Sequence, residues 1–283
     1  MPELPEVETI RKQLSQNIKG KIIKNIEVID KKLAKSIKKS INNSKIKKLE
    51  RYGKAILIKL SNKNCIGIHI KLTGQLIFMP KSKKDKLFSI AGVKQILPNK
   101  YTRAIIYFTD GAVLYFNDIR RFGWIKIDSC RKLQQDGFFS NLGPDALKKT
   151  LTISYFSNII KSSKSSIKSL LMDQKKISGI GNIYANDALF LAGVHPKRPA
   201  ESLSKQEAAK LYQAIQHVLK KGLKYKGASE INFVDIFGRP GEYQKHSLVY
   251  GKENNPCPKH CGERIKRIKI AGRGTFYCPG CQK

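Results

Sequence analysis

The sequence has few acidic residues and no apolar run long enough to cross a membrane. Its 283 residues include 21 Asp and Glu against 55 Lys and Arg, which gives a formal net charge of +34. This balance argues against a basic partner and favours a polyanion, with nucleic acid ahead of an anionic membrane surface. A spanning helix needs about 18 consecutive apolar residues, whereas apolar runs such as 55–58 have the length of core strands.

The positive charge has a second explanation. Only 11 of the 55 basic residues are Arg, and the chain is also rich in Ile and Asn. A genome rich in A and T would raise Lys, Ile and Asn together, so charge alone indicates DNA or RNA binding without establishing it. With 41% apolar residues the chain can build proper cores, and its length suggests about two domains.

The N-terminus lacks the basic and apolar segments of a secretory signal, so we expect a cytoplasmic protein. Before its last 27 residues the chain has only two cysteines, Cys65 and Cys130. In a reducing compartment both are expected to be ordinary core thiols.

Hydrophobic periodicity separates β-type from helical segments. Residues 1–15 have helical spacing, whereas short β-branched and aromatic runs between 20 and 128 predict an antiparallel sandwich or barrel. Residues 146–222 are helical by period, and a Gly-rich segment follows at 227–241. Residues 82–98 are expected to form a long loop or an inserted hairpin. The expected strands are 22–29, 55–60, 65–70, 75–78, 104–108, 113–116 and 123–127.

The last four cysteines have the spacing of a metal site. Cys257 and Cys261 are separated by three residues, Cys278 and Cys281 by two, and 16 residues lie between the pairs. Two close thiolate pairs of this kind predict a tetrahedral zinc site, whose metal supplies folding free energy to a small hairpin. His260 is an alternative ligand to Cys261. Basic residues alternate with apolar ones between the pairs, which favours contact with phosphates.

A second candidate is the glycine-flanked turn Gly179-Ile180-Gly181-Asn182 between two helical segments. Backbone N–H groups at such a turn can bind phosphate. A turn that serves only helix packing is the alternative.

The third candidate is the N-terminus. Removal of Met1 before the small Pro2 would leave a secondary amine, and α-amino groups have a pKa of about 7.7–8.0. Helical spacing places Glu3 within the apolar arc of the first helix and Glu6 at its edge, whereas Glu8 is expected to be a solvated charge. Proline and acidic residues are also common at ordinary helix starts.

Five segments occur in order along the chain: MPELPEVE at 1–8, NDIRRFG at 117–123, LGP at 142–144, GIGNIYA at 179–185 and the cysteine module at 257–281. Together they resemble bacterial formamidopyrimidine-DNA glycosylases, which repair 8-oxoguanine, and the resemblance extends over essentially the whole chain. The resemblance implies an α+β fold with an N-terminal, helix-flanked antiparallel β-sandwich (1–142), a helical helix–two-turn–helix domain (143–226), and a lesion loop with a zinc β-hairpin (227–283). DNA would bind in the cleft between the halves.

The resemblance also implies the catalytic roles. Pro2 matches the nucleophile that attacks C1′ of the damaged nucleotide, Glu3 the proton donor for ring opening, and Glu6 a helper carboxylate. Lys54 matches a lysine that binds a phosphate beside the lesion and assists elimination. Arg273 matches a phosphate ligand tied to the second elimination.

Further DNA contacts follow in the same way. Asn182 matches a phosphate ligand, and Arg120 and Phe122 match side chains that enter the duplex. Lys164 lies beside a DNA-contact position, which is Ser163 here. The implied protein is a monomer that binds double-stranded DNA containing oxidised purines, with one structural zinc, no organic cofactor and no membrane partner.

The sequence departs from the family pattern in five places. Leu72 stands where a void-filling Met is usual, Tyr101 and Arg103 stand where histidines are usual, and Asp187 replaces a Glu. The first cysteine pair has one extra residue, and the segment 80–100 is longer than usual. The candidate residues Pro2, Glu3, Lys54, Asn182 and Arg273 are all present.

Two other functions fit parts of this pattern. One is a zinc-dependent DNA-binding protein without catalytic activity, and the other is the related endonuclease for oxidised pyrimidines. The intact PELPEVE and the Arg120-Arg121-Phe122-Gly123 run favour the purine enzyme over the pyrimidine enzyme.

Overall fold

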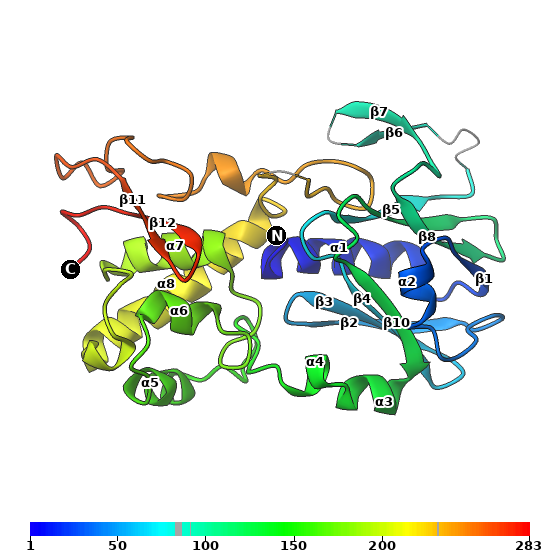
Figure 1. Ribbon diagram of the computed structural model, residues 1–283, viewed down its shortest axis with the longest axis horizontal. Coiled ribbons are helices and arrows are strands. Elements are labelled where there is room, and N and C mark those ends of the chain that lie inside the picture. Colours follow the sequence, from blue (N-terminus) through cyan, green and yellow to red (C-terminus); the bar gives the residue numbers. More distant parts are fainter. Residues whose placement is uncertain (83–86, 91, 231) are drawn as a thin grey trace. The chain divides into compact units, whose positions relative to one another are not determined.

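The computed structural model describes residues 1–82, 87–90, 92–230 and 232–283, and the chain divides into two compact units (Figure 1). The N-terminal unit contains Met1–Ser140 and Tyr225–Glu242. The C-terminal unit contains Asn141–Lys224 and Tyr243–Lys283. The expected third segment, 227–283, is therefore divided between the two units after Glu242.

The N-terminal unit is the predicted antiparallel sandwich. Its apolar cluster draws on both sheets, including Ile58 of one and Phe116 of the other. Alternating side chains of each strand point inward, which places the core between the sheets. One sheet has the order β1 (Ile23–Val28), β8 (Thr102–Phe108), β9 (Val113–Asp118), β5 (Gly74–Met79); the other has the order β10 (Trp124–Ser129), β4 (Asn64–His69), β3 (Ala55–Leu60), β2 (Ile46–Tyr52).

Helix α1 (Leu4–Ile18) packs on the sandwich and confirms the predicted N-terminal helix. Val7, Ile10 and Leu14 are at most 1% exposed and belong to the cluster of the sandwich. The helix is thereby anchored along its length, so its first turn has a fixed place in the unit. The short helices of this unit are α2 (Lys31–Ala34), α3 (Cys130–Gln135) and α4 (Gly137–Ser140).

Strand β2 lies where the sequence predicts no strand. Charged residues interrupt its apolar alternation, and a register shift occurs between Ile46 and Lys48. An edge strand tolerates both features because only one side of it is paired.

The inserted hairpin is confirmed within the longer segment 80–100. Strand β6 (Leu87–Ile90) pairs with β7 (Val93–Ile96), and its inward side chains Phe88 and Ile90 join a second apolar cluster with Tyr115. Residues 83–86 and 91 of this segment lie outside the described residues.

The C-terminal unit is helical and ends in a hairpin, as predicted. Helices α7 (Asn182–Ala192) and α8 (Lys205–Lys224) pack so closely that a side chain at Gly222 would place its Cβ 2.5 Å from the ring of Tyr184. No helix within the described ranges is long and apolar enough to cross a membrane. The elements are α5 (Ile153–Lys161), α6 (Ile167–Met172), α7 (Asn182–Ala192), η1 (Ala200–Ser202), α8 (Lys205–Lys224), η2 (Tyr243–Lys245), β11 (Lys266–Ile270) and β12 (Arg273–Tyr277).

The expectation of two reduced core thiols in the N-terminal unit is wrong. Cys65 and Cys130 form a disulfide, with their Cα atoms 4.8 Å apart. The pairing of β4 with β10 places Asp128 opposite Cys65, and the chain then turns into α3 so that Cys130 lies over Cys65. Sequence spacing could not reveal this contact because it depends on the register of two strands that are 65 residues apart.

Reduction of this disulfide is expected to destabilise the N-terminal unit. The bond closes a loop of 65 residues, which in the chain-entropy description contributes about 4 kcal/mol to the free energy of unfolding. Urea unfolding followed by Trp124 fluorescence, with and without a non-chelating reductant, measures the loss. The double variant Cys65→Ala/Cys130→Ala is the control, since a reductant effect that persists in it would contradict this origin.

Candidate functional site

The start of α1 is buried and held by Glu6. Pro2 is buried, and Glu3 is 2% exposed at the N-cap of the helix. The fully buried Glu6 carboxylate accepts hydrogen bonds from the backbone N–H groups of Glu3 and Ala228, both at 2.7 Å. A side chain at Gly227 would place its Cβ 2.7 Å from Glu6 Cγ, so only glycine allows this approach. Each oxygen of Glu6 thus has a backbone donor, which favours a positioning role over proton transfer.

The expectation that Glu8 is a solvated charge is wrong. Its carboxylate pairs with Arg11 at 2.7 Å and with Arg51 at 3.1 Å. Burial raises the pKa of Glu8, but the hydrogen bond from Arg11 and the charge of Arg51 outweigh it, so the pKa lies below its usual value. Arg51 is 6% exposed and could not be paired from the sequence, because Glu8 lies 43 residues away.

The ion pair of Glu8 with Arg51 stabilises the turn that carries Lys54. Arg51 Nη1 donates to the carbonyl oxygen of Gly53 at 2.9 Å, and Gly53 has φ +55° in the tight turn between β2 and β3. Lys54 follows in the same turn and is 5% exposed. The sequence-predicted lysine therefore lies on a turn whose backbone is fixed by the chain from Glu8 through Arg51.

His69 is a buried neutral histidine that the sequence did not single out. Burial, with the charges of Lys71 and Lys54, lowers its pKa to about 3. Its Nδ1 accepts a hydrogen bond from the backbone N–H of Lys71 at 3.0 Å, which places the proton of the neutral ring on Nε2. A single histidine in a strand carries no sequence signal that distinguishes it from a core residue.

The side chains expected to enter the duplex are exposed at neighbouring turns. Leu72 is 37% exposed and Phe122 is 48% exposed. The Arg120 guanidinium lies 4.7 Å from the centroid of the Phe122 ring. The backbone N–H of Arg120 donates to the Thr73 hydroxyl at 3.0 Å, so the turn that carries Leu72 is bonded to the loop that carries Arg120 and Phe122.

Arg103 and Tyr101, which replace usual histidines, support the same loop. Arg103 Nε donates to the carbonyl oxygen of Asp118 at 2.8 Å, and Asp118 N–H donates to the carbonyl oxygen of Tyr101 at 2.9 Å. In this chain the two positions therefore bind the backbone at the start of the loop.

In the C-terminal unit, the glycine turn and the zinc hairpin are joined by side-chain amides. Asn182 begins α7, and its Nδ2 donates to the carbonyl oxygen of Gly274 at 3.1 Å. Asn186, one turn later, accepts from the backbone N–H of Phe276 at 2.7 Å. The two predicted phosphate-binding motifs are thus brought together within this unit, with Arg273 at the start of β12.

Lys168 is a further basic residue at this place, and sequence reasoning missed it. It is 1% exposed, and its Nζ donates to Gly274 O at 3.2 Å and to Thr275 Oγ1 at 2.6 Å. With Arg273 it lines a cavity of about 180 Å³ beside the β11–β12 turn. Lys164, the residue chosen from the sequence, is exposed in the loop before α6. The sequence feature that could have identified Lys168 is the presence of a lysine within the apolar stretch of α6.

Asp187 organises the segment that leads to the cysteine module. It is fully buried and accepts from the Tyr243 hydroxyl at 2.8 Å. It also accepts from the backbone N–H groups of Leu248, Val249 and Tyr250. Asp187, which stands where Glu is usual, thus still supplies a buried carboxylate, and this carboxylate accepts hydrogen bonds from four donors.

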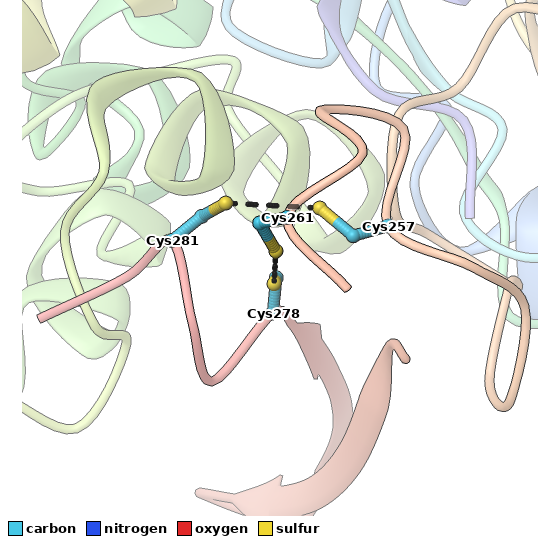
Figure 2. Close-up of side chains that lie close together, drawn as sticks. All are labelled: Cys257, Cys261, Cys278 and Cys281. Atoms are coloured by element: carbon cyan, nitrogen blue, oxygen red, sulfur yellow. Dashed lines mark hydrogen bonds between the residues drawn. The ribbon is translucent and has the colours of Figure 1, made fainter. Parts of the chain in front are cut away.

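The four cysteines form the predicted metal site (Figure 2). Their sulfur atoms all lie within 4.8 Å of one another, with 3.7 Å between Cys257 and Cys281 and 3.4 Å between Cys261 and Cys278. Tetrahedral zinc with Zn–S bonds of about 2.3 Å requires sulfur atoms about 3.8 Å apart, so the residues present fit the ion. The alternative ligand His260 is exposed and is not part of this cluster.

Three family domains match the sequence in the expected order. Residues 1–125 match the formamidopyrimidine-DNA glycosylase N-terminal domain. Residues 142–233 match the formamidopyrimidine-DNA glycosylase H2TH domain, and residues 254–283 match a zinc finger found in FPG and IleRS.

Similar proteins cover the full length of the chain. A formamidopyrimidine-DNA glycosylase of Carboxydothermus hydrogenoformans is 39% identical over 289 residues, with all of both chains covered. The crystal structure of the MutM (Fpg) protein of Thermus thermophilus aligns with a TM-score of 0.85 at 32% identity, covering 99% of this chain and 98% of that one. Fpg of Lactococcus lactis in complex with abasic-site DNA aligns with a TM-score of 0.86 at 28% identity, covering 99% of both chains. The chain therefore belongs to the formamidopyrimidine-DNA glycosylases, zinc-finger enzymes of DNA base excision repair with glycosylase and abasic-site lyase activity.

Proposed function

We propose that this chain removes oxidised purines, such as 8-oxoguanine and formamidopyrimidines, from double-stranded DNA and cleaves the strand at the abasic site. The observation that carries the proposal is the buried Pro2–Glu3 start of α1, held by the two backbone hydrogen bonds of Glu6. A mutant of Lactococcus lactis Fpg has been crystallised with DNA containing Fapy-dG, which supports this substrate class. We further propose that the protein acts as a monomer on the DNA of the bacterial cytoplasm.

The first step requires the free amine of Pro2. Removal of Met1 exposes this secondary amine, whose nitrogen lone pair is the nucleophile. The nitrogen attacks C1′ as the bond from C1′ to the base breaks, and the proton lost by the amine neutralises the departing base. Glu3 then protonates the ring oxygen O4′ as the C1′–O4′ bond breaks and the sugar opens. The product is an iminium ion between Pro2 and C1′.

Strand cleavage follows from the same intermediate. A secondary amine gives an iminium that cannot lose its charge by deprotonation at nitrogen, so it acidifies the C2′ hydrogens. Loss of a C2′ proton expels the 3′ phosphate, and a second elimination expels the 5′ phosphate. Lys54 and Arg273 bind phosphates near the lesion, and we assign them to the support of these two departures.

Access to the base is the task of the exposed loop side chains. Extruding a nucleotide from the stack costs a few kcal/mol. Arg120, by hydrogen bonding to the unpaired base, and Phe122, by wedging the neighbouring step, offset part of this cost. Lys54, Asn182 and Arg273 bind phosphates and carry no base information.

Borohydride trapping tests the proposal directly. The protein is incubated with one duplex containing 8-oxoguanine opposite cytosine and a second containing thymine glycol, and covalent adducts are quantified. Glu3→Gln serves as the matched variant: base removal should fall by about 10²–10⁴-fold, while cleavage of a preformed abasic site is partly retained because that sugar is already open.

Each alternative gives a different result. Preferential trapping on thymine glycol would indicate the pyrimidine enzyme, and binding without any adduct would indicate a DNA-binding protein without activity. Equal loss of both activities in Glu3→Gln would indicate a structural carboxylate.

Leu72→Met is expected to raise the single-turnover rate on 8-oxoguanine a few-fold. Leu is branched and shorter than Met, so it fills an irregular gap between unstacked bases less well. The difference corresponds to about 1 kcal/mol, as for other volume-similar apolar exchanges. Cleavage of a preformed abasic site, which needs no extrusion, should not change. An unchanged rate on 8-oxoguanine, or an equal change on both substrates, would contradict this role of Leu72.

Lys168→Met is expected to weaken DNA binding roughly five-fold. Without the Lys168 hydrogen bonds the turn that presents Arg273 is less ordered in the free protein, and ordering it on binding costs free energy. Because Lys168 is buried under that turn and Arg273 still reaches the phosphate, the salt dependence of binding should stay constant. Fluorescence anisotropy at several salt concentrations measures both quantities.

Lys164→Met is the matched control, from the exposed loop before α6. If Lys164 contacts a phosphate, its loss lowers the salt slope by about one. A lower slope in Lys168→Met would instead mean that Lys168 itself reaches the DNA.

A further inference from the structure

Residues 119–122 form a loop that exposes large apolar side chains. Ile119 is 47% exposed and Phe122 is 48% exposed, and the Arg120 guanidinium stacks on the Phe122 ring. Exposed apolar side chains gain no stability from burial, so the shape of the loop must be set by its polar contacts.

Asp118 fixes the two ends of this loop. It is 1% exposed; its Oδ2 accepts from the backbone N–H of Gly123 at 2.7 Å, and its Oδ1 accepts from the Thr73 hydroxyl. Thr73 in turn accepts from the backbone N–H of Arg120. These contacts hold residues 118, 120 and 123 but leave the backbone of Arg121 to be fixed by something else.

Arg121 has a left-handed backbone conformation, with φ +56°. For a residue with a long side chain this conformation is unfavourable and persists only where surrounding contacts impose it. Two contacts support it here. Arg121 Nε and Nη2 donate to the two carboxylate oxygens of Asp30, each at 2.8 Å, and Lys32 Nζ donates to the backbone carbonyl oxygen of Arg121 at 3.3 Å.

Asp30 is itself held in place. Its side chain is 3% exposed, whereas that of Arg121 is 55% exposed. Oδ1 also accepts from the backbone N–H of Lys32, which makes Asp30 the N-cap of α2, and Asp30 N–H donates to the carbonyl oxygen of Arg103 at 3.1 Å. The hydrogen bonds from Arg121 lower the pKa of Asp30 against the opposing effect of burial, so the pair is ionised at neutral pH.

We propose that Asp30 is a positioning residue for duplex entry: through Arg121 it holds the loop in the shape that presents Arg120 and Phe122 to the DNA. This inference rests on the proposed function. Arg121 lies between the two entering residues, so a change of its backbone from the left-handed to the extended region would turn Arg120 and Phe122 away from each other. A loop ordered in advance avoids the loss of conformational freedom on binding.

The test is Asp30→Asn in single-turnover assays. Asn retains the size of Asp and an acceptor for the N–H of Lys32, but it loses the charge and one half of the bidentate pair. Excision of 8-oxoguanine is expected to fall about tenfold, the rate equivalent of one unfavourable backbone conformation. Cleavage of a preformed abasic site should change less than about twofold, because no base is extruded. The fluorescence of 2-aminopurine beside the lesion should rise more slowly, since it reports unstacking.

Asp110→Asn is the matched control. Asp110 pairs with Lys21 and accepts from the backbone N–H of Ala112 at 3.0 Å, so it has the same kinds of partner at the other end of β9. Equal losses in the two variants, or equal losses of Asp30→Asn on both substrates, would overturn the proposal. Excision at the wild-type rate in Asp30→Asn would also overturn it, whereas absence of excision by the unmodified chain would contradict the proposed function itself.

A double-variant cycle tests the route through Arg121. Gly at position 121 adopts the left-handed conformation without a partner, so Asp30→Asn should have little additional effect in an Arg121→Gly background. Fully additive effects of the two substitutions would show that Asp30 acts through the N-cap of α2 and would overturn the proposal.

Discussion

Pro2→Gly is expected to slow removal of 8-oxoguanine by roughly a hundredfold or more, because a nucleophile that loses its fixed geometry loses most of the advantage of proximity. Glycine keeps a terminal amine but not the ring that defines its direction, and its primary amine gives an imine that can lose its charge. Single-turnover rates of base removal measure the effect. Borohydride trapping of the unmodified protein, followed by peptide mass analysis, should place the adduct on Pro2.

The control for this substitution is Pro5→Ala. Pro5 lies in the first turn of the same helix and is buried, but it is not at the chain end. If Pro5→Ala slowed base removal as much as Pro2→Gly, the loss of activity would come from a disturbed start of the helix and not from loss of the nucleophile. An adduct on Lys54, or full activity in protein that retains Met1, would contradict the assignment of Pro2.

Cys278→Ser is expected to remove the zinc and to weaken DNA binding about a hundredfold, equivalent to two charge-assisted contacts of about 1.4 kcal/mol each. The apolar cluster around the site is small and includes Cys257 and Cys278 themselves, so the metal supplies most of the folding free energy of this module. Without it the β11–β12 hairpin should unfold, and the position of Arg273 is lost. Metal analysis and anisotropy titrations on undamaged duplex measure the two effects.

The N-terminal sandwich should survive this substitution because its core is separate. His260→Asn is the matched control: His260 has φ +54°, which Asn tolerates, and it lies beside Cys261 without belonging to the cluster. One zinc per chain and normal DNA binding are expected for it. A Cys278→Ser protein that bound DNA normally would contradict a role of the module in binding.

Local pattern was enough for the parts of this protein whose signal lies within a short stretch of chain. Helical spacing predicted α1, alternation predicted most strands of the sandwich, and the cysteine spacing predicted the zinc site. Strand β2 was not predicted because its charged residues and its register shift break the apolar alternation. The motifs from MPELPEVE to the cysteine module identified the family, since each is local in the sequence and can be recognised without the fold.

The tertiary structure decided which distant residues meet. Glu8 is paired because α1 packs against strand β2, which carries Arg51. Cys65 is oxidised because β4 and β10 align it with Cys130, and Asp30 holds Arg121 across 91 residues of chain. Lys168, and not Lys164, lies under the zinc hairpin for the same kind of reason. Such contacts depend on strand register and on the packing of elements far apart in the chain. A single sequence records periodicity and composition, but it does not record which charged side chain will lie opposite which.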